Sequence, residues 1–502
     1  TTIALTNSEN YIIAVPTTEL IENKCYPTKD ADGNVKFWKK HERKAGLSPV
    51  VYNLFGLYGN FTLELKKQLK DYLSSVGVKK IICTYDKIDK LMEFINPVDF
   101  KLMVDEYHNF LKQYSFRDKA INGVLAHFKE FKSYCFLSAT PIPKALKPSI
   151  FNGIPEYIAN WSESDEITVY PYHTDKPYMV AVKFIKTYQI KGYLNVNGIE
   201  SREAYFFINS VTEIKAILKQ TQLTEDDYRI ICADNDKNRM TLKGYTISSS
   251  TDTPKKFNFI TSKSFEGVDF HSESGICFVV SNVQNRHTLV SIDMDIPQIA
   301  GRIRTKTNPF RNKIVHIFNT KPTDHYTTYE EMEHIVQDEI KAAQERADLL
   351  NSSNLSESAI KQQVSEIHKI GNESYLSYQY GKFVVNDMIG KLQLYSFLIT
   401  NVVYNSDKSL RDTYGQNRMI VTKGKWHIAP EKFVKDLIKE PTFRDLHKRY
   451  CEIMKNPMTL NLETIEIEHK YPILGRARRK LGIQELKRLR TIKSIKLALG
   501  EI

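Results

Sequence analysis

Short apolar runs alternate with longer amphipathic segments in the first part of the chain. The runs have strand length, each closed by a polar residue or a turn, and they are residues 11–15, 80–84, 101–105 and 134–138. Between them, residues 62–75 and 117–132 have helical patterns. Strands that alternate with helices predict a parallel sheet with helices on both faces. The pattern indicates a first α/β domain over residues 1–160.

A second alternation of the same kind follows. Its strand-like runs are residues 204–210, 229–233, 257–262, 275–281 and 313–318, with helices expected over 211–221 and 295–304. Residues 151–170 are mixed and polar, so we interpret them as the boundary region. A second parallel sheet of similar size is therefore expected in residues 161–320.

After about residue 320 helical periodicity takes over. Residues 327–350 carry apolar side chains at helical spacing, and most of the remaining chain has the same character. Residues 321–502 are therefore predicted to form a mainly α-helical accessory region. The predicted fold class is α/β, with two parallel-sheet domains in tandem and a helical C-terminal region.

The composition is that of a globular protein. The chain has 502 residues, of which 41% are hydrophobic and 26% charged. No stretch approaches the roughly 18 to 20 apolar residues that would span a bilayer, and the opening residues do not resemble a signal peptide. The six cysteines lie far apart, which favours reduced thiols over disulfides or a zinc site. We expect a cytoplasmic protein without a membrane partner, in a host cytoplasm if the protein is viral.

Basic charge is concentrated near the C-terminal end. The net charge is +12, and residues 469–502 hold ten Lys and Arg against two Glu. Such a segment favours a polyanionic partner, usually nucleic acid, although a solvated basic surface is the alternative. Residues 475–500 mix these cations with Leu and Ile at near-helical spacing. They predict either a basic helix face on nucleic acid or a helix that packs its apolar stripe while its charges stay solvated.

Polar residues collect where the predicted strands end, which is where parallel sheets carry their functional groups. In the first domain these residues are Pro16-Thr17-Thr18, Thr84, Asp105-Glu106 with His108, and Ser138-Ala139-Thr140. In the second they are Thr261-Ser262, Glu266-Gly267-Val268-Asp269, and Gln298-Ile299-Ala300-Gly301-Arg302-Ile303-Arg304. Two adjacent carboxylates after an apolar strand are costly unless something binds them.

In this order and spacing, the motifs over roughly residues 1–320 resemble those of superfamily 2 helicases of the DExH type. The resemblance implies two RecA-like domains, with ATP and Mg²⁺ in the cleft between them and nucleic acid across their top. Asp105 would then hold Mg²⁺, Glu106 would orient or deprotonate the attacking water, and His108 would sense the γ-phosphate state. Arg302 would be the first arginine finger. The family's usual second finger falls on Thr305, and Arg304 lies one residue early.

The resemblance assigns the remaining motif residues as well. Gln298, Gly267 and Asp269 would contact nucleotide or couple the domains. Ser138 and Thr140 would link hydrolysis to domain movement, although a plain strand exit has the same sequence. Short hydroxyl side chains suit sequence-independent phosphate contacts, for which the candidates are Thr17, Thr18, Thr84, Thr261 and Ser262. For each hydroxyl the alternative is a local turn or cap.

One expected motif is missing. No phosphate-binding loop of the form G-x-x-x-x-G-K-[ST] occurs in the 502 residues. Thr1 stands where the loop's Thr, a Mg²⁺ ligand, should be. Either the loop precedes residue 1 in the natural protein, or the motor is naturally shortened and inactive. The other motor positions are intact, which favours the first explanation.

The sequence thus predicts an ATP-dependent helicase or translocase that moves along or unwinds nucleic acid, with DNA favoured over RNA. A catalytically silent scaffold that binds nucleic acid is the alternative, and a motor that follows duplex without unwinding it is a third possibility. Residues 321–502 are a candidate surface for a protein partner. The Lys, Ile, Asn and Tyr content is typical of an AT-rich genome, such as that of a phage or mobile element.

Overall fold

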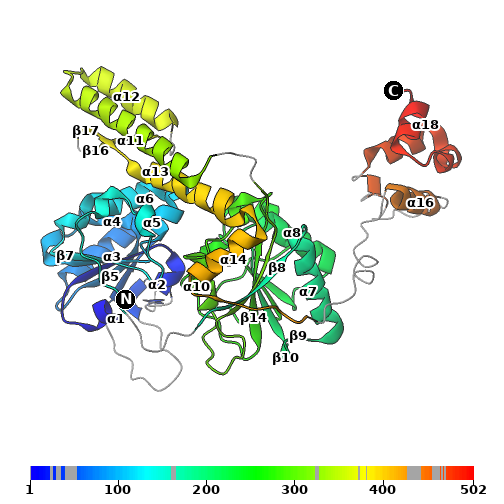
Figure 1. Cartoon of the computed structure of the whole chain (residues 1–502), viewed down its shortest axis with the longest axis horizontal. Helices are drawn as coiled ribbons and strands as arrows, with labels where there is room; N and C mark the ends of the chain where they lie inside the picture. Colours follow the sequence, from blue (N-terminus) through cyan, green and yellow to red (C-terminus); the bar gives the residue numbers. More distant parts are fainter. Residues whose placement is uncertain are drawn as a thin grey trace. The chain divides into compact units, whose positions relative to one another are not determined.

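The computed structural model divides the chain into two compact units, Thr1–Ile428 and Ala429–Ile502. It describes residues 2–22, 26–29, 35–39, 54–159, 166–250, 252–322, 327–370, 374–379, 381–426, 443–454, 464, 467–468 and 471–501. The first unit contains two parallel sheets, and the second is helical (Figure 1).

The first sheet has five parallel strands in the order β4-β5-β1-β6-β7. They are β1 Tyr11–Val15, β4 Leu54–Leu57, β5 Lys80–Thr84, β6 Lys101–Asp105 and β7 Ser133–Leu137. Its helices are α1 Thr2–Thr6, α2 Thr18–Glu22, α3 Leu63–Ser74, α4 Ile88–Leu91, α5 Asn109–Lys112 and α6 Tyr114–His127. The inner strands have apolar centres because helices cover both faces of a parallel sheet.

The second sheet has seven parallel strands in the order β12-β13-β11-β14-β15-β8-β18. They are β8 Thr168–His173, β11 Glu203–Phe207, β12 Tyr228–Ile231, β13 Phe257–Ile260, β14 Gly275–Ser281, β15 Lys313–Phe318 and β18 Ile420–Val421. Its helices are α7 Pro177–Lys191, α8 Val211–Thr221, α9 Asp236–Thr241 and α10 Asp295–Ala300. Three two-stranded sheets accompany the large ones: β2 Tyr26–Lys29 with β3 Val35–Lys39, β9 Leu194–Val196 with β10 Ile199–Ser201, and β16 Leu376–Gln379 with β17 Lys382–Val385.

The predicted fold class is confirmed, with local differences. Strand β8 begins inside the interval interpreted as a boundary, and its Pro171 obscures the strand pattern because proline lacks a backbone donor. The helix expected over 295–304 ends at Ala300, since Ile303 instead forms a bridge with Phe270.

The segment after the second sheet joins both sheets. It contains α11 Tyr329–Ser352, α12 Glu357–Ile370, α13 Asp387–Phe397, the π-helix η9 Leu398–Val402, η10 Val403–Asn405 and α14 Asp407–Gln416. Met388 and Leu394 of α13 lie in the core of the first sheet, whereas Tyr404 and Tyr414 lie in the core of the second. The short β18 then pairs with β8.

The predicted helical character of residues 321–502 therefore holds for most of the part that is described. The helices of the second unit are α16 Phe443–Ile453, α18 Pro472–Arg488 and α19 Ile492–Leu499. Among the described residues, no helix combines the length and the apolar character needed to cross a membrane.

Candidate functional site

The carboxyl end of β6 makes a sharp turn that presents the predicted acidic pair. Asp105 ends the strand. Glu106 adopts a positive φ of 53°, which is an unfavourable backbone conformation for any residue other than glycine. The Tyr85 hydroxyl donates to the carbonyl oxygen of Asp105 at 2.6 Å, and the amide of Tyr107 donates to Leu137 O at 3.1 Å. These bonds hold the turn against the ends of β5 and β7.

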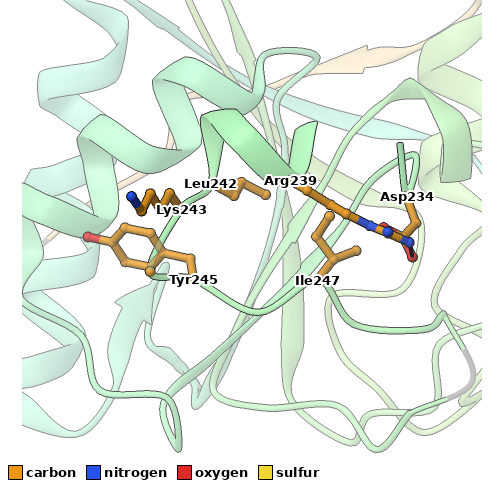
Figure 2. Close-up of a pocket in the computed structure, with 7 residues that line it drawn as sticks. Asp234, Arg239, Leu242, Lys243, Tyr245 and Ile247 are labelled. Atoms are coloured by element: carbon orange, nitrogen blue, oxygen red, sulfur yellow. Dashed lines mark hydrogen bonds and ion pairs between the residues drawn. The ribbon is translucent and has the colours of Figure 1, made fainter. Parts of the chain in front are cut away.

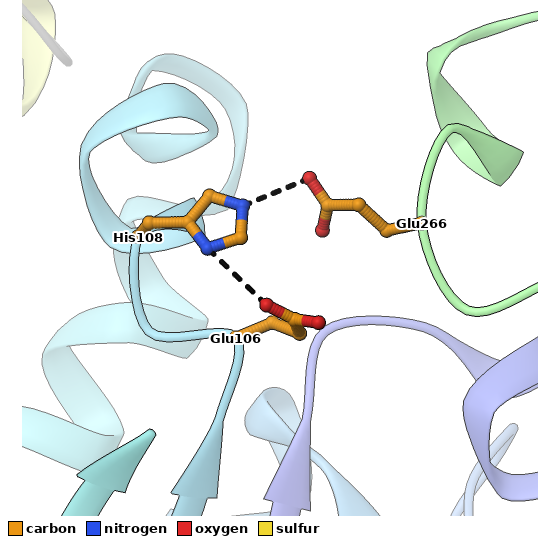
Figure 3. A group of neighbouring side chains, drawn as sticks. All are labelled: Glu106, His108 and Glu266. Atoms are coloured by element: carbon orange, nitrogen blue, oxygen red, sulfur yellow. Dashed lines mark hydrogen bonds and ion pairs between the residues drawn. The ribbon is translucent and has the colours of Figure 1, made fainter. Parts of the chain in front are cut away.

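His108 follows this turn, and its side chain contacts the part of the unit that contains the second sheet. Its ring is fully buried, with Nδ1 2.8 Å from Ser138 Oγ and 3.4 Å from Glu106 Oε2. Its Nε2 lies 2.9 Å from Glu266 Oε1 (Figure 3). Ser138 Oγ also accepts from the amide of Thr140 at 3.0 Å. The structure thus brings together residues from three separate predicted motifs.

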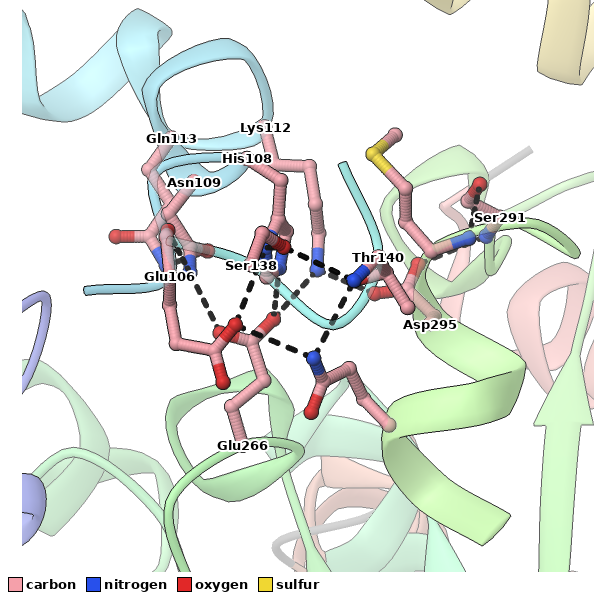
Figure 4. Close-up of polar contacts among 12 residues, drawn as sticks. Glu106, His108, Asn109, Lys112, Gln113, Ser138, Thr140, Glu266, Ser291 and Asp295 are labelled. Carbon is pink, nitrogen blue, oxygen red and sulfur yellow. Dashed lines mark hydrogen bonds and ion pairs between the residues drawn. The ribbon is translucent and has the colours of Figure 1, made fainter. Parts of the chain in front are cut away.

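Glu266 is the centre of a buried charge network between the sheets (Figure 4). Asn109 Nδ2 donates to its Oε2 at 2.5 Å, and Lys112 Nζ lies 2.9 Å from its Oε1 and 2.5 Å from Asp295 Oδ1. Burial alone would raise the pKa of Glu266, but Lys112 and His108 hold that pKa well below its usual range. Burial likewise opposes the charge on Lys112, while Asp295 and Glu266 keep its pKa above the usual value.

The sequence did not assign roles to the members of this network other than His108. Glu266 was seen only as part of a motif, and Asn109, Lys112 and Asp295 were missed. The available signal was the spacing of His108 and Lys112, which places both on one face of a helix. Nothing in the local sequence indicates that Asp295 lies opposite Lys112.

Glu106, His108 and Glu266 also have the composition of a metal site, since their ligand atoms lie within 4.8 Å of one another. The neighbouring ammonium argues against a cation there. Lys112 Nζ and His108 Nε2 both approach the same oxygen, Glu266 Oε1, at 2.9 Å. We therefore interpret the group as a hydrogen-bonded charge network.

The pKa of Glu106 is shifted towards neutrality. Burial, followed by the nearby charge of Glu266, raises the pKa of Glu106 to about 7, although His108 opposes the shift. Gln298 of α10 donates from Nε2 to Glu106 Oε2 at 3.3 Å and to Thr140 Oγ1 at 3.2 Å. A carboxyl that titrates near neutral pH is suited to act as a general base.

Arg302 carries a buried charge without a carboxylate partner. It is 6% exposed, and its guanidinium donates to Gln298 O at 2.6 Å, to Gln298 Oε1 at 3.3 Å and to Val268 O at 3.1 Å. Within the described residues, no Asp or Glu oxygen lies within 4.0 Å of this guanidinium. Arg304 differs, because its Nε donates to Asp269 Oδ1 at 2.7 Å in a half-exposed ion pair.

Gly267, with a φ of 75°, packs against Leu20, and an added Cβ would lie 2.6 Å from Leu20 Cγ.

A cavity of about 560 Å³ gathers the first-domain hydroxyl candidates. Thr17, Thr18 and Thr84 line it together with Lys263, which extends from the second sheet's side and lies 2.5 Å from Glu19 Oε1. Thr17 Oγ1 is buried and has no hydrogen-bond partner among the described residues. An orphaned hydroxyl in a cavity wall is a site where a ligand oxygen can bind.

The other hydroxyl candidates do not line this cavity. Thr261 donates from Oγ1 to Ile231 O at 3.4 Å, and the amide of Ser262 donates to Asn209 Oδ1 at 3.2 Å. Both precede Lys263 directly in the chain. Thr1 lies outside the described residues.

A second cavity of about 280 Å³ lies beside α9 (Figure 2). None of the predicted site residues lines it. Arg239, on its wall, donates to Asp234 at 2.6 and 2.9 Å. Because it holds none of the predicted site residues, this cavity is the weaker candidate for a site.

Comparisons with known proteins found similar solved structures only. No protein-family model matches the chain, and no curated protein matches it. The DEAD-box helicase Mss116 bound to ssRNA and UDP-BeF is 13% identical, with a TM-score of 0.36 and 82% of each chain covered. The Mycobacterium smegmatis helicase Lhr bound to ssDNA and AMP-PNP is 11% identical, with a TM-score of 0.37, covering 95% of this chain and 67% of that one. A S. cerevisiae Dbp5 variant bound to RNA and ADP BeF3 is 12% identical, with a TM-score of 0.35, covering 64% of this chain and 73% of that one.

Proposed function

We propose that the protein is a nucleic-acid-dependent ATPase of the superfamily 2, DExH type, which couples hydrolysis to movement along or unwinding of nucleic acid. One observation carries the proposal. The buried guanidinium of Arg302 bonds only to neutral oxygens among the described residues and lies close to Glu106, a carboxyl poised near neutral pH. A buried cation without an anion is unfavourable, and a phosphate group would supply the anion.

The residues at this junction can divide the chemistry of phosphoryl transfer to water. Glu106, when ionised, accepts the proton of the attacking water, and Gln298 orients its carboxylate. Arg302 stabilises the negative charge that develops on the phosphoryl oxygens. Asp105, at the open end of β6, offers the oxygen ligand that Mg²⁺ prefers, and the bound ion would neutralise phosphate charge.

The network around Glu266 connects the residues proposed for hydrolysis to the contacts between the two sheets. His108 contacts Ser138 from the first sheet and Glu266 from the second, and Gln298 bridges Glu106 and Thr140. An anion that draws Arg302 away from Gln298 would release Gln298 from one partner. The occupancy of the site would thereby change the contacts that hold the two sheets together.

Nucleic acid is proposed to bind along the cavity of Thr17, Thr18 and Thr84. The unpaired hydroxyl of Thr17 and the ammonium of Lys263 suit phosphate oxygens, and neither reads a base. DNA is the substrate we propose first, with RNA as the second arm of the test.

The test is ATP hydrolysis by the purified full-length protein, with and without single-stranded DNA or RNA. We expect Glu106→Gln to abolish stimulated hydrolysis, and Arg302→Gln to lower it by about 10³-fold or more. Arg239→Gln is the control, because it removes an arginine that is paired with Asp234 and belongs to none of the predicted motifs. If Arg302→Gln and Arg239→Gln hydrolyse ATP equally well, the proposed site is wrong. If nucleic acid binds but no variant hydrolyses ATP, the silent scaffold is the better assignment.

A further inference from the structure

The second unit has a hydrophobic core of its own. Its buried residues come from all three of its main helices and are Leu446, Tyr450, Cys451, Ile467, Ile473, Leu474, Ala477, Leu486, Ile495 and Leu499. The apolar stripe of α19, Ile495 and Leu499, is thus buried within this unit. The Leu and Ile residues of the basic segment therefore build the unit itself, and its charges remain on the outside.

These charges are strongly one-sided. The described residues of the second unit hold twelve Lys and Arg against five Asp and Glu. Five of the cations form what we call the basic edge, which spans the end of α18 and the first part of α19: Lys487, Arg488, Arg490, Lys493 and Lys496. All five are exposed. Only Arg488 has a carboxylate partner within the described residues, Glu485 at 3.4 Å.

We propose that the basic edge binds the phosphate backbone of duplex nucleic acid, at a site separate from the cavity of Thr17. Five cations within ten residues repel one another, and among the described residues only Arg488 is paired with a carboxylate. A duplex carries about one negative charge per 1.7 Å of its axis, so it can neutralise several of these cations at once. The expected ligand is therefore a polyanion rather than a single phosphate.

The aromatic residues of the unit favour a duplex over a single strand. Proteins that hold single strands stack bases on exposed aromatic rings. In the described part of this unit, no aromatic side chain is exposed: Tyr450 is fully buried, and Phe443 packs against Tyr471 with ring centroids 5.0 Å apart. The unit can therefore grip a backbone, but it offers no stacking platform.

A membrane surface is the competing polyanion. Basic helices that lie on membranes insert a broad apolar face between the lipids. The apolar face of α19 is already buried in the core, and only Ile492 and Leu497 remain exposed on this helix, at 39% and 67%. Two side chains are a small surface for insertion, so the structure favours nucleic acid.

The test measures duplex affinity of the full chain without nucleotide, so that it does not depend on ATP hydrolysis. A fluorescent duplex, in separate DNA and RNA arms, is titrated by anisotropy at several salt concentrations. The variant carries Lys487→Gln, Arg490→Gln, Lys493→Gln and Lys496→Gln. A charge-matched control replaces four exposed lysines of the first unit: Lys219→Gln, Lys341→Gln, Lys361→Gln and Lys382→Gln.

We expect the basic-edge variant to bind duplex at least tenfold more weakly near physiological salt. The slope of log K against log salt should become shallower by up to about 3.6, since each lost phosphate contact removes about 0.9. The control should bind as the unaltered protein does. A second variant, Lys487→Arg with Lys493→Arg and Lys496→Arg, should retain affinity because it keeps the charges.

Three results would overturn the proposal. They are an unchanged duplex affinity in the basic-edge variant, an equal loss in the control, and tight binding of the unaltered protein to phosphatidylserine vesicles but not to duplex. Because all substitutions lie on exposed positions, the helical circular dichroism signal should not change. Failure of this test leaves stimulated ATP hydrolysis untouched, so the two proposals fail separately.

Discussion

Titration of Glu106 should control the rate of ATP hydrolysis around neutral pH. Its pKa is raised to about 7, first by burial and then by Glu266. Only the ionised carboxylate can accept a proton from water. With this pKa, about one-eleventh of the carboxyl is ionised at pH 6 and about ten-elevenths at pH 8, so the saturated rate should rise about tenfold over this interval.

Substitution of His108 tests whether Glu106 produces this rise in rate. His108 opposes the upward shift of the Glu106 pKa. His108→Gln should therefore move the rising limb of the pH–rate profile to higher pH without abolishing it. The assay is the nucleic-acid-stimulated rate at saturating ATP from pH 5.5 to 9, in buffers of constant ionic strength. A rate that varies less than twofold between pH 6 and 8, or a limb that disappears in His108→Gln, would refute this reasoning.

Three further predictions concern this junction and the cavity of Thr17. The shift of the Glu106 pKa from 4.5 to about 7 corresponds to a free energy of roughly 3 kcal/mol. This contribution to folding stability is fully present below pH 4.5 and is lost as the pH rises through 7. Glu106→Gln should therefore be more stable than the unaltered protein at pH 8 but not at pH 4.5, as judged by thermal melting, and equal stability at pH 8 would contradict this. Lys112→Met should destabilise the first unit by about 3–5 kcal/mol in denaturant titrations, because Glu266 and Asp295 lose their shared cation. Adding Glu266→Gln and Asp295→Asn to this variant should restore much of the lost stability. Thr17→Val should leave thermal stability unchanged or raise it, since the hydroxyl of Thr17 has no hydrogen-bond partner in the described fold. The same variant should bind single-stranded nucleic acid more weakly in anisotropy measurements. Equal binding would count against the cavity as the binding site.

The sheets could be predicted from the sequence because their strands are buried on both faces. Runs such as residues 80–84 and 275–281 are almost wholly apolar, and the structure places both as strands with those bounds. Strand β8 escaped because Pro171 and the tyrosines beside it do not produce such a run. The pairing of β18 with β8 could not be foreseen either, because a two-residue strand carries no periodicity and is held by a partner about 250 residues away in the chain.

The candidate site could be predicted only as far as each strand end. The sequence singled out Glu106, His108, Gln298 and Arg302, and the structure places them at one junction. Their contacts across the junction depend on how the two sheets face each other, which no local pattern encodes. Arg304, which lies one residue before the second-finger position of the resemblance, pairs with Asp269 in a half-exposed ion pair that the sequence did not indicate.

The charges at the junction explain why Glu106 titrates where it does. Lys112, whose side chain is 15% exposed, is paired with both Glu266 and Asp295, so these three groups together carry one net negative charge. An ionised Glu106 adds a further negative charge beside Glu266, and the low-dielectric surroundings make this addition unfavourable, although His108 and Arg302 oppose the shift. The near-neutral pKa of Glu106 is therefore a property of the whole inter-sheet network. It follows that a substitution as distant from the reacting water as Lys112→Met should also raise the pH at which hydrolysis begins, since it leaves Glu106 facing a more negative junction.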